Sequence, residues 1–299
     1  MERVKTRHIF LQEKLFWSLA YHDIFDFPLT LGELIHWESN AVSDRKFLVQ
    51  KTGEYYHLPR RFSLALIRRD REKQFLGKIK EAKRRAHLLS FVPTIRFIGI
   101  SGSLAMHNAD KGSDIDLFII TTQGTMWITR VVVKILALFL GISLRQPQKS
   151  YPHNALCLNL WLDEVHYEIP ENLRNIYTAH EVAQVIPLVN KGGTFEAFIV
   201  ANSWFAEYWP SALPRFTNKE DNGLHIVRVI VSKFVAPLEL LVYHLQLRYM
   251  QSRRTRELIE PGRAFFHPID WKDIVLAEFN RRVVKYNQDQ HFNFKASTS

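Results

Sequence analysis

Cysteine is almost absent from the sequence. Cys157 is the single cysteine among 299 residues, so an internal disulfide and a zinc site built from cysteines are both excluded. The sequence also lacks a Gly-x-Ser-x-Gly elbow and a histidine pair at helical spacing with a nearby glutamate, which are local signatures of serine hydrolases and zinc enzymes. We expect Cys157 to be a small core residue in a reducing, cytoplasmic setting.

Long apolar runs free of charge are absent too. The two most apolar segments, 125–144 and 224–247, are interrupted by Arg130, Lys134, Arg228, Lys233 and Glu239. Neither offers the ~20 uninterrupted apolar residues that a membrane span requires, so we expect buried helices. Attachment of the second segment to a membrane surface is the alternative. The first 17 residues are charged and do not resemble a secretory signal.

Acidic residues are in the minority. The chain has 40 Lys and Arg against 30 Asp and Glu, a formal net charge of +10 and a pI near 9.6. This balance favours a polyanionic partner or substrate such as a nucleic acid or a nucleotide. With 46% hydrophobic residues, including 21 Phe and 7 Trp, the chain can also bury a substantial core.

The sequence predicts an α+β fold in four parts. Residues 1–60 have the order of a winged-helix-like module: a helix over 9–22, a second opened by the capping box of Thr30 and Glu33, a third from Ser43, and an aromatic strand over 54–61. Such modules bind nucleic acids or serve as packing units, and order alone does not separate the two.

Residues 61–90 form a basic connecting helix in this prediction. Phe75, Ile79, Ala82, Ala86 and Leu89 give it one apolar stripe, while lysines and arginines crowd the rest. The basic face over 60–85 is either simply solvated or a contact surface for a phosphate backbone. Residues 91–170 follow as strand, helix, strand, helix, strand, and residues 171–299 are expected to be a helical C-terminal domain.

Two aspartates stand on an apolar strand in "SGSLAMHNADKGSDIDLFIIT". Residues i and i+2 of a strand point to the same side, so Asp114 and Asp116 present both carboxylates to one face. Mg²⁺ prefers such oxygen ligands and leaves its other positions to water and phosphates. Gly102 and Ser103 precede a short predicted helix, where a phosphate could approach the backbone closely.

The spacing of Gly102-Ser103 and Asp114-Ile115-Asp116 resembles the signature of the DNA polymerase beta-like nucleotidyltransferase superfamily, and the flanking residues look like its minimal prokaryotic members. The resemblance covers roughly 91–170. It implies that Gly102, Ser103 and Ser113 bind a nucleoside triphosphate. It further implies that Asp114 and Asp116 bind Mg²⁺, as two ions or as one.

The superfamily also has a third acidic residue on a later strand. The matching position here is Asn159, which offers an oxygen ligand but no charge. Glu168 on an adjacent strand could supply the missing carboxylate and is counted with the catalytic residues.

Two hypotheses follow. The first is a Mg²⁺-dependent enzyme that transfers a nucleoside monophosphate to a hydroxyl of RNA, protein or a small molecule. The second is a nucleic-acid-binding or regulatory protein with a degenerate, non-catalytic domain. The oligomeric state cannot be read from the sequence.

Overall fold

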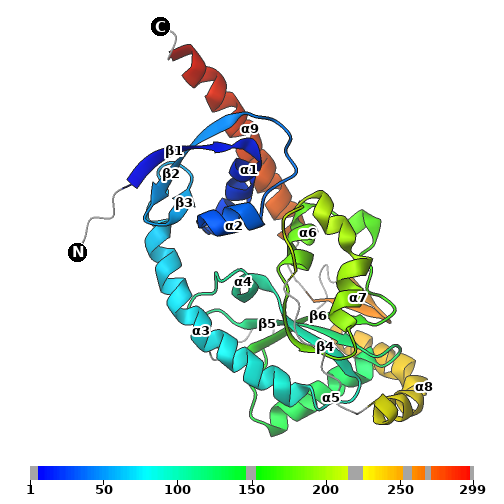
Figure 1. Cartoon of the computed structure of the whole chain (residues 1–299). Helices are drawn as coiled ribbons and strands as arrows, with labels where there is room; N and C mark the ends of the chain where they lie inside the picture. The colour runs from blue at the N-terminus through cyan, green and yellow to red at the C-terminus, as the bar shows by residue number, and fades with distance from the viewer. Residues whose placement is uncertain (1–5, 146–152, 215–224, 252–257, 267–270, 297–299) are drawn as a thin grey trace.

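The computed structural model describes residues 6–145, 153–214, 225–251, 258–266 and 271–296. The chain is a mixed α+β protein with one three-stranded and one six-stranded sheet, which confirms the predicted fold class. The N-terminal part lies at one end of the larger sheet, and a long helix, α3 (Leu64–Leu89), runs beside both (Figure 1).

The N-terminal module has fewer helices than predicted. Strand β1 (Thr6–Gln12) leads directly into α1 (Glu13–His22), α2 (Leu31–His36) follows, and β2 (Lys46–Thr52) and β3 (Tyr55–His57) complete an antiparallel sheet in the order β1-β2-β3. The capping box of Thr30 and Glu33 is confirmed. The predicted helix from Ser43 is wrong, because residues 43–45 are irregular and β2 begins at Lys46, where alternate side chains bury Phe47 and Val49. The module therefore lacks the third helix of the predicted order.

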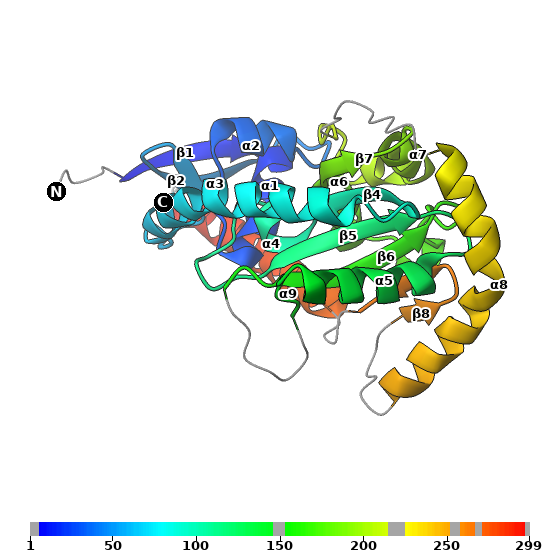
Figure 2. The ribbon, with the colours of Figure 1, turned by 90° about the horizontal axis from the view of Figure 1, so that it is seen from below.

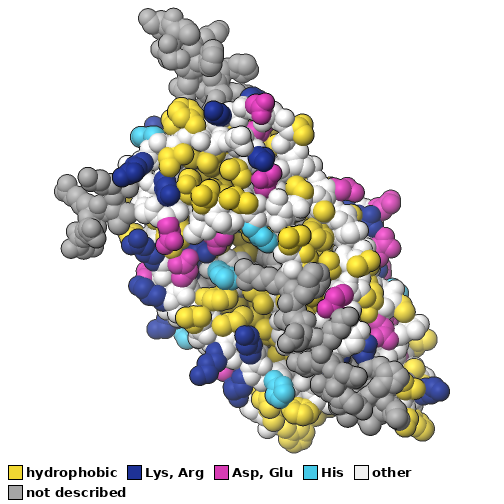
Figure 3. All heavy atoms as spheres, viewed as in Figure 1, with side chains coloured by type: hydrophobic (Ala, Val, Ile, Leu, Met, Phe, Trp, Pro, Cys, Tyr) yellow, Lys and Arg dark blue, Asp and Glu magenta, His cyan; other side chains and the backbone are white. Residues whose placement is uncertain are grey.

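Helix α3 carries the predicted apolar stripe. Ala82, Ala86 and Leu89 are buried in the main core, and Phe75 and Ile79 pack against it. Several of the basic side chains are used inside the fold, however. Arg68 is buried between Glu33 and Glu72 and lies over the Phe27 ring, and Lys78 is buried as well. The basic face is thus partly structural. Its exposed side chains lie along the side of the molecule where α3 runs (Figure 3). These exposed members include Arg69, Lys73, Lys80, Lys83 and Arg84.

The six-stranded sheet has the order β7-β4-β5-β6-β9-β8. Its strands are β4 (Ile95–Ile100), β5 (Ile115–Thr121), β6 (Leu156–Asp163), β7 (Ile186–Asn190), β8 (Leu258–Glu260) and β9 (Arg263–Phe265). Strands β5 and β6 are parallel, and the other neighbours are antiparallel. The expectation that 171–299 is helical is wrong here, because β7, β8 and β9 extend both edges of the sheet. A sheet edge exposes unpaired backbone groups. Strands β7 and β9 of the C-terminal part pair with β4 and β6, and so cover both edges of the sheet that residues 91–170 form.

Helices cover both faces of this sheet. One face packs against α3 and α5 (Met126–Phe139), and α8 (His225–Met250) lies on α5 (Figure 2). The other face packs against α6 (Ile176–Ala183), α7 (Thr194–Ala201) and the 3₁₀ turn η3 (Ser203–Glu207). Strand residues alternate between the two, since Ile115, Leu117 and Ile119 join the first core and Phe118 joins the second.

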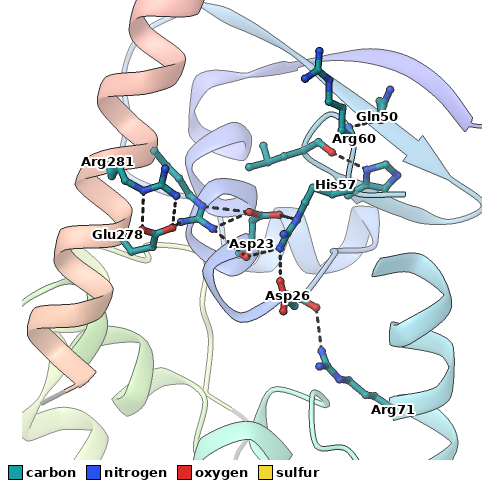
Figure 4. Close-up of polar contacts among 11 residues, drawn as sticks. Asp23, Asp26, Gln50, His57, Arg60, Arg71, Glu278 and Arg281 are labelled. Atoms are coloured by element: carbon teal, nitrogen blue, oxygen red, sulfur yellow. Dashed lines mark hydrogen bonds and ion pairs between the residues drawn. The ribbon is translucent and has the colours of Figure 1, made fainter. Parts of the chain in front are cut away.

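The last helix, α9 (Trp271–Ala296), joins the N-terminal module to the rest. Its Arg282 donates to Asp23 at 3.1 Å, and Asp23 also accepts from Arg61 at 3.1 Å. Arg71 of α3 donates to the backbone oxygen of Asp26 in the same turn (Figure 4). Charge-assisted hydrogen bonds of this kind hold long basic side chains in one orientation and fix the module against α3 and α9.

Within the described residues, we find no helix with the length and apolarity needed to cross a membrane.

Candidate functional site

The two aspartates lie at the start of β5, in the middle of the larger sheet. Asp114 immediately precedes the strand and Asp116 is its second residue, on the same side of the sheet as Phe118. Both are partly buried, and the Asp114 side chain is 14% exposed. The structure therefore brings the two carboxylates to one face, under α6, as the alternation of the sequence predicts.

Gly102 lies directly against this pair. It adopts a left-handed conformation at φ +61°, and a Cβ atom placed on it would be 2.5 Å from Oδ2 of Asp116. The preceding residue, Ser101, donates its backbone N–H to the Asp116 carbonyl at 3.1 Å. Glycine is required here for both its backbone conformation and the close approach. The Gly-Ser turn and the Asp-x-Asp strand thus form one site, although Gly102 and Asp116 are 14 residues apart in sequence.

The third predicted position also faces the pair. The Asn159 amide donates to Oδ1 of Asp116 at 3.1 Å. A β-bulge places it there: Asp116 pairs with Cys157 and Phe118 with Leu160, so β6 has one extra residue between these pairs. The structure therefore places an asparagine, and not a third carboxylate, beside Asp116 at this position.

Arg145 and Cys157 complete the surroundings of the pair, and the prediction from sequence did not include them in the site. Arg145 donates to Oδ2 of Asp114 at 2.8 Å and lies 3.7 Å from Sγ of Cys157. Among the described residues, Asp114, Asp116 and Cys157 form a group whose potential metal-binding atoms all lie within 4.8 Å of one another. The positive charge beside Asp114 in this structure is the guanidinium of Arg145. No sequence motif pointed to it, because 31 residues separate the partners.

The electrostatics of the site are those of crowded acids. Burial, followed by the charge of Asp114, raises the pKa of Asp116 to about 7. Hydrogen bonds from Cys157 and Asn159 and the charge of Arg145 act in the opposite direction but do not cancel these two effects. Burial also raises the pKa of the Cys157 thiol. Such a carboxyl is half protonated near neutral pH, which is common where a site is arranged to bind or react.

Glu168 lies away from the pair. It belongs to an irregular segment after β6, not to a strand as predicted, and it is exposed with its carboxylate 2.5 Å from Arg174. It is not a member of the Asp114, Asp116 and Cys157 group.

Of the two serines, Ser103 lies in the short helix α4 (Gly102–Ala105) beside the pair. The Ser113 hydroxyl donates to Asp110 at 2.8 Å and stabilises the turn before Asp114. The prediction that Ser113 binds nucleotide is not supported by this contact.

A different carboxylate stands near the pair. Glu181 of α6 lines a cavity of about 260 Å³ together with Ser101 and Phe118. Burial, followed by the charge of Asp116, raises the pKa of Glu181 to about 8, so Glu181 lies within electrostatic reach of Asp116. Although Glu181 keeps some exposed surface, that surface faces the mostly apolar cavity, which accounts for its desolvation.

Glu181 follows Thr178 by three residues, which is the spacing of a capping box, but it does not cap α6. Helix α6 begins earlier, and Asn175 is its N-cap, accepting from the backbone N–H groups of Tyr177 and Thr178. Thr178 is the third residue of the helix and completes the capping box from inside. The Glu181 carboxylate is therefore not used at the helix start. It accepts from the Gln184 amide at 2.5 Å and also lines the cavity.

The donor set fits a divalent cation with hard ligands. Asp114 and Asp116 offer carboxylate oxygens, Asn159 could offer its amide oxygen after rotation, and the Asp116 carboxylate can lie against Gly102 only because that residue has no Cβ. Arg145 occupies one carboxylate oxygen and would have to move.

No family model, curated protein or solved structure matches this chain. The function proposed below therefore rests on the geometry of the site.

Proposed function

We propose that this chain is a Mg²⁺-dependent nucleotidyltransferase that transfers a nucleoside monophosphate from a nucleoside triphosphate to an acceptor hydroxyl. The close approach of Gly102 to Asp116 is the observation that carries the proposal. It joins the Gly-Ser turn, which the resemblance assigns to the triphosphate, and a strand with two carboxylates suited to a metal ion into one site. The resemblance of residues 91–170 to the DNA polymerase beta-like superfamily supports the same function.

The proposed reaction is a displacement at phosphorus. The acceptor oxygen forms a bond to the α-phosphorus, the bond from that phosphorus to the α–β bridging oxygen breaks, and pyrophosphate leaves with the bonding electrons. The acceptor proton passes to a nearby carboxylate or to water. Mg²⁺, when bound, neutralises the negative charge on the phosphate oxygens.

The residues of this chain would divide the work as follows. Asp114 and Asp116 hold the ion, and Gly102 and Ser103 admit the triphosphate to the backbone of the turn. Arg145, whose side chain is 41% exposed, leaves Asp114 when the ion binds and pairs with a phosphate oxygen. This exchange would keep Asp114 and Arg145 each beside an opposite charge in both states.

The test is transfer of label from α-³²P-labelled nucleoside triphosphates, with Mg²⁺ and RNA, protein and small-molecule acceptors. We expect the double variant Asp114→Asn, Asp116→Asn to lose transfer by at least ~100-fold, because it removes both charges that hold the ion. Asp70→Asn on exposed α3 is the matched control and should keep full activity. Undiminished transfer by the double variant would refute the proposal.

A second candidate function is favoured by Asn159. A site with two carboxylates, an asparagine and a resident arginine could bind nucleotide without turnover, in a nucleic-acid-binding or regulatory protein. The variant Asn159→Asp separates the candidates: a rate gain of ~10-fold or more fits a slow enzyme, while nucleotide binding without transfer in either form fits the second candidate. RNA binding through the exposed residues of α3 would weaken steeply with salt.

A further inference from the structure

A cavity of about 260 Å³ begins where the acidic site ends. Three of its lining residues adjoin site residues on or directly after three neighbouring strands. Ser101 directly follows β4 and precedes Gly102, Phe118 lies two positions after Asp116 on β5, and Leu160 follows Asn159 on β6. The cavity therefore opens beside the acid pair, between the sheet and α6.

The wall of the cavity is mostly apolar. Nine of its sixteen lining residues are leucines, phenylalanines and valines, and Trp271 of α9, which is 43% exposed, lines it as well. A polyanionic backbone would lose its hydration here without gaining paired charges, which is costly. An apolar molecule would gain by leaving water.

The polar groups of the cavity are few. Glu181 and Ser101 lie toward the acid pair, and the charge of Asp116 acts on Glu181. Two carboxyl groups at this end favour a ligand group that donates a hydrogen bond and oppose a second anion. Lys272 also lines the cavity, but its ammonium donates to the backbone oxygen of Asn172 at 3.4 Å.

We infer that this cavity is the acceptor site and that the acceptor is a small, largely apolar molecule, of one or two rings, with a hydroxyl directed at Glu181. The acceptor role rests on the proposed nucleotidyl transfer, whereas the binding site itself does not. In the transfer, the acceptor oxygen bonds to the α-phosphorus, its proton passes to Glu181 when that group is ionised or otherwise to water, and pyrophosphate leaves. The Glu181 carboxylate positions the hydroxyl toward the phosphate end of the site.

Binding to the full chain is measured by calorimetry with 2-naphthol as the probe, without nucleotide. Leu173→Trp narrows the cavity from its half-buried wall, and we expect it to weaken 2-naphthol binding at least 10-fold. Glu181→Gln keeps the volume but removes the carboxylate charge that is present above pH 8, so at pH 8.5 we expect binding to weaken by 3- to 10-fold. Naphthalene-2-carboxylate should bind at least 10-fold more weakly than 2-naphthol.

Two variants outside the cavity are matched controls. Val200→Trp places the same side chain on the exposed surface of α7, and Glu171→Gln makes the same exchange in the exposed turn before α6. Both should bind 2-naphthol like the parent chain. Thermal unfolding of each variant shows whether a loss of binding is a loss of fold, and Glu181→Gln carries the test if Leu173→Trp does not fold.

The outcomes separate this inference from the proposed function. If 2-naphthol binding is absent, or is unchanged in both cavity variants, the cavity is a packing space and the inference is overturned even where transfer to RNA is observed. If 2-naphthol binds as expected but no nucleotidyl transfer to any acceptor is found, the ligand site stands and its acceptor role falls.

Discussion

The two faces of the six-stranded sheet differ in how their buried charged groups are compensated by hydrogen-bond partners. Under α3 and α5, the Lys78 ammonium donates to two backbone oxygens and to Asn154, and the Glu239 carboxylate of α8 accepts from the backbone N–H groups of Trp127 and Ile128 at the start of α5. Under α6, burial and the charge of Asp116 raise the pKa of Glu181, no cation among the described residues is paired with that carboxyl group, and an open cavity adjoins it.

This difference separates buried charges that stabilise the fold from those that remain available to a ligand. A buried ion with several hydrogen-bond partners stabilises the segments that it joins, as Lys78 does for the turn before Asp114. Two neighbouring carboxyl groups without an equal number of cations destabilise the folded chain until a cation or donor arrives. The first face therefore holds the site in place, and the second carries the carboxyl groups to which the proposed function assigns binding.

The largest expected effect is on the first face. Lys78→Met leaves the backbone oxygens of Lys111 and Ser113 and the side chain of Asn154 without their shared donor, and should lower the free energy of unfolding by about 3 kcal/mol. Urea denaturation measures this. Lys83→Met, exposed on the same helix, is the control and should change stability little. Equal stability of the two variants would show that Lys78 does not hold the turn.

A smaller effect of opposite sign is expected on the second face. The pKa of Asp116 is about 7 in the folded chain, above its ordinary value, so folding stability is lost as pH rises from about 4 to about 7. With a chelator present at pH 8, the variant Asp116→Asn should therefore have a free energy of unfolding about 2 kcal/mol higher than that of the parent chain. This value takes into account that Asp116 is partly exposed. The difference between the variant and the parent chain should shrink toward pH 4, and a constant difference would contradict this account.

The smallest effect concerns the ion itself. Because Mg²⁺ binds the ionised carboxylate, its affinity should rise about 10-fold between pH 6 and pH 8 as Asp116 loses its proton. Calorimetric titration in two buffers of different ionisation enthalpy would also detect the released proton. Asp116→Asn should remove the pH dependence along with most of the affinity, and a pH-independent affinity in the parent chain would count against Asp116 as a ligand.

Local patterns predicted much of the chain. The apolar stripe of α3, the capping box of α2 and the strands β4, β5 and β6 follow from period and cap residues, which act over a few positions. The predictions that failed depended on distant partners. Residues 186–190 became a strand because the edge of β4 was available for pairing, and the segment after Ser43 stayed extended into β2, which pairs with β1.

The site divides in the same way. The sequence by itself determined that Asp114 and Asp116 share a face, because alternation along a strand is a local rule, and that a glycine lies before them in the chain. Only the tertiary structure decided which groups meet them: Asn159 through a bulge, Arg145 across 31 residues, and Glu181 from a helix on the covering layer. Side-chain proximity of this kind is set by how the layers pack, and packing depends on the whole core.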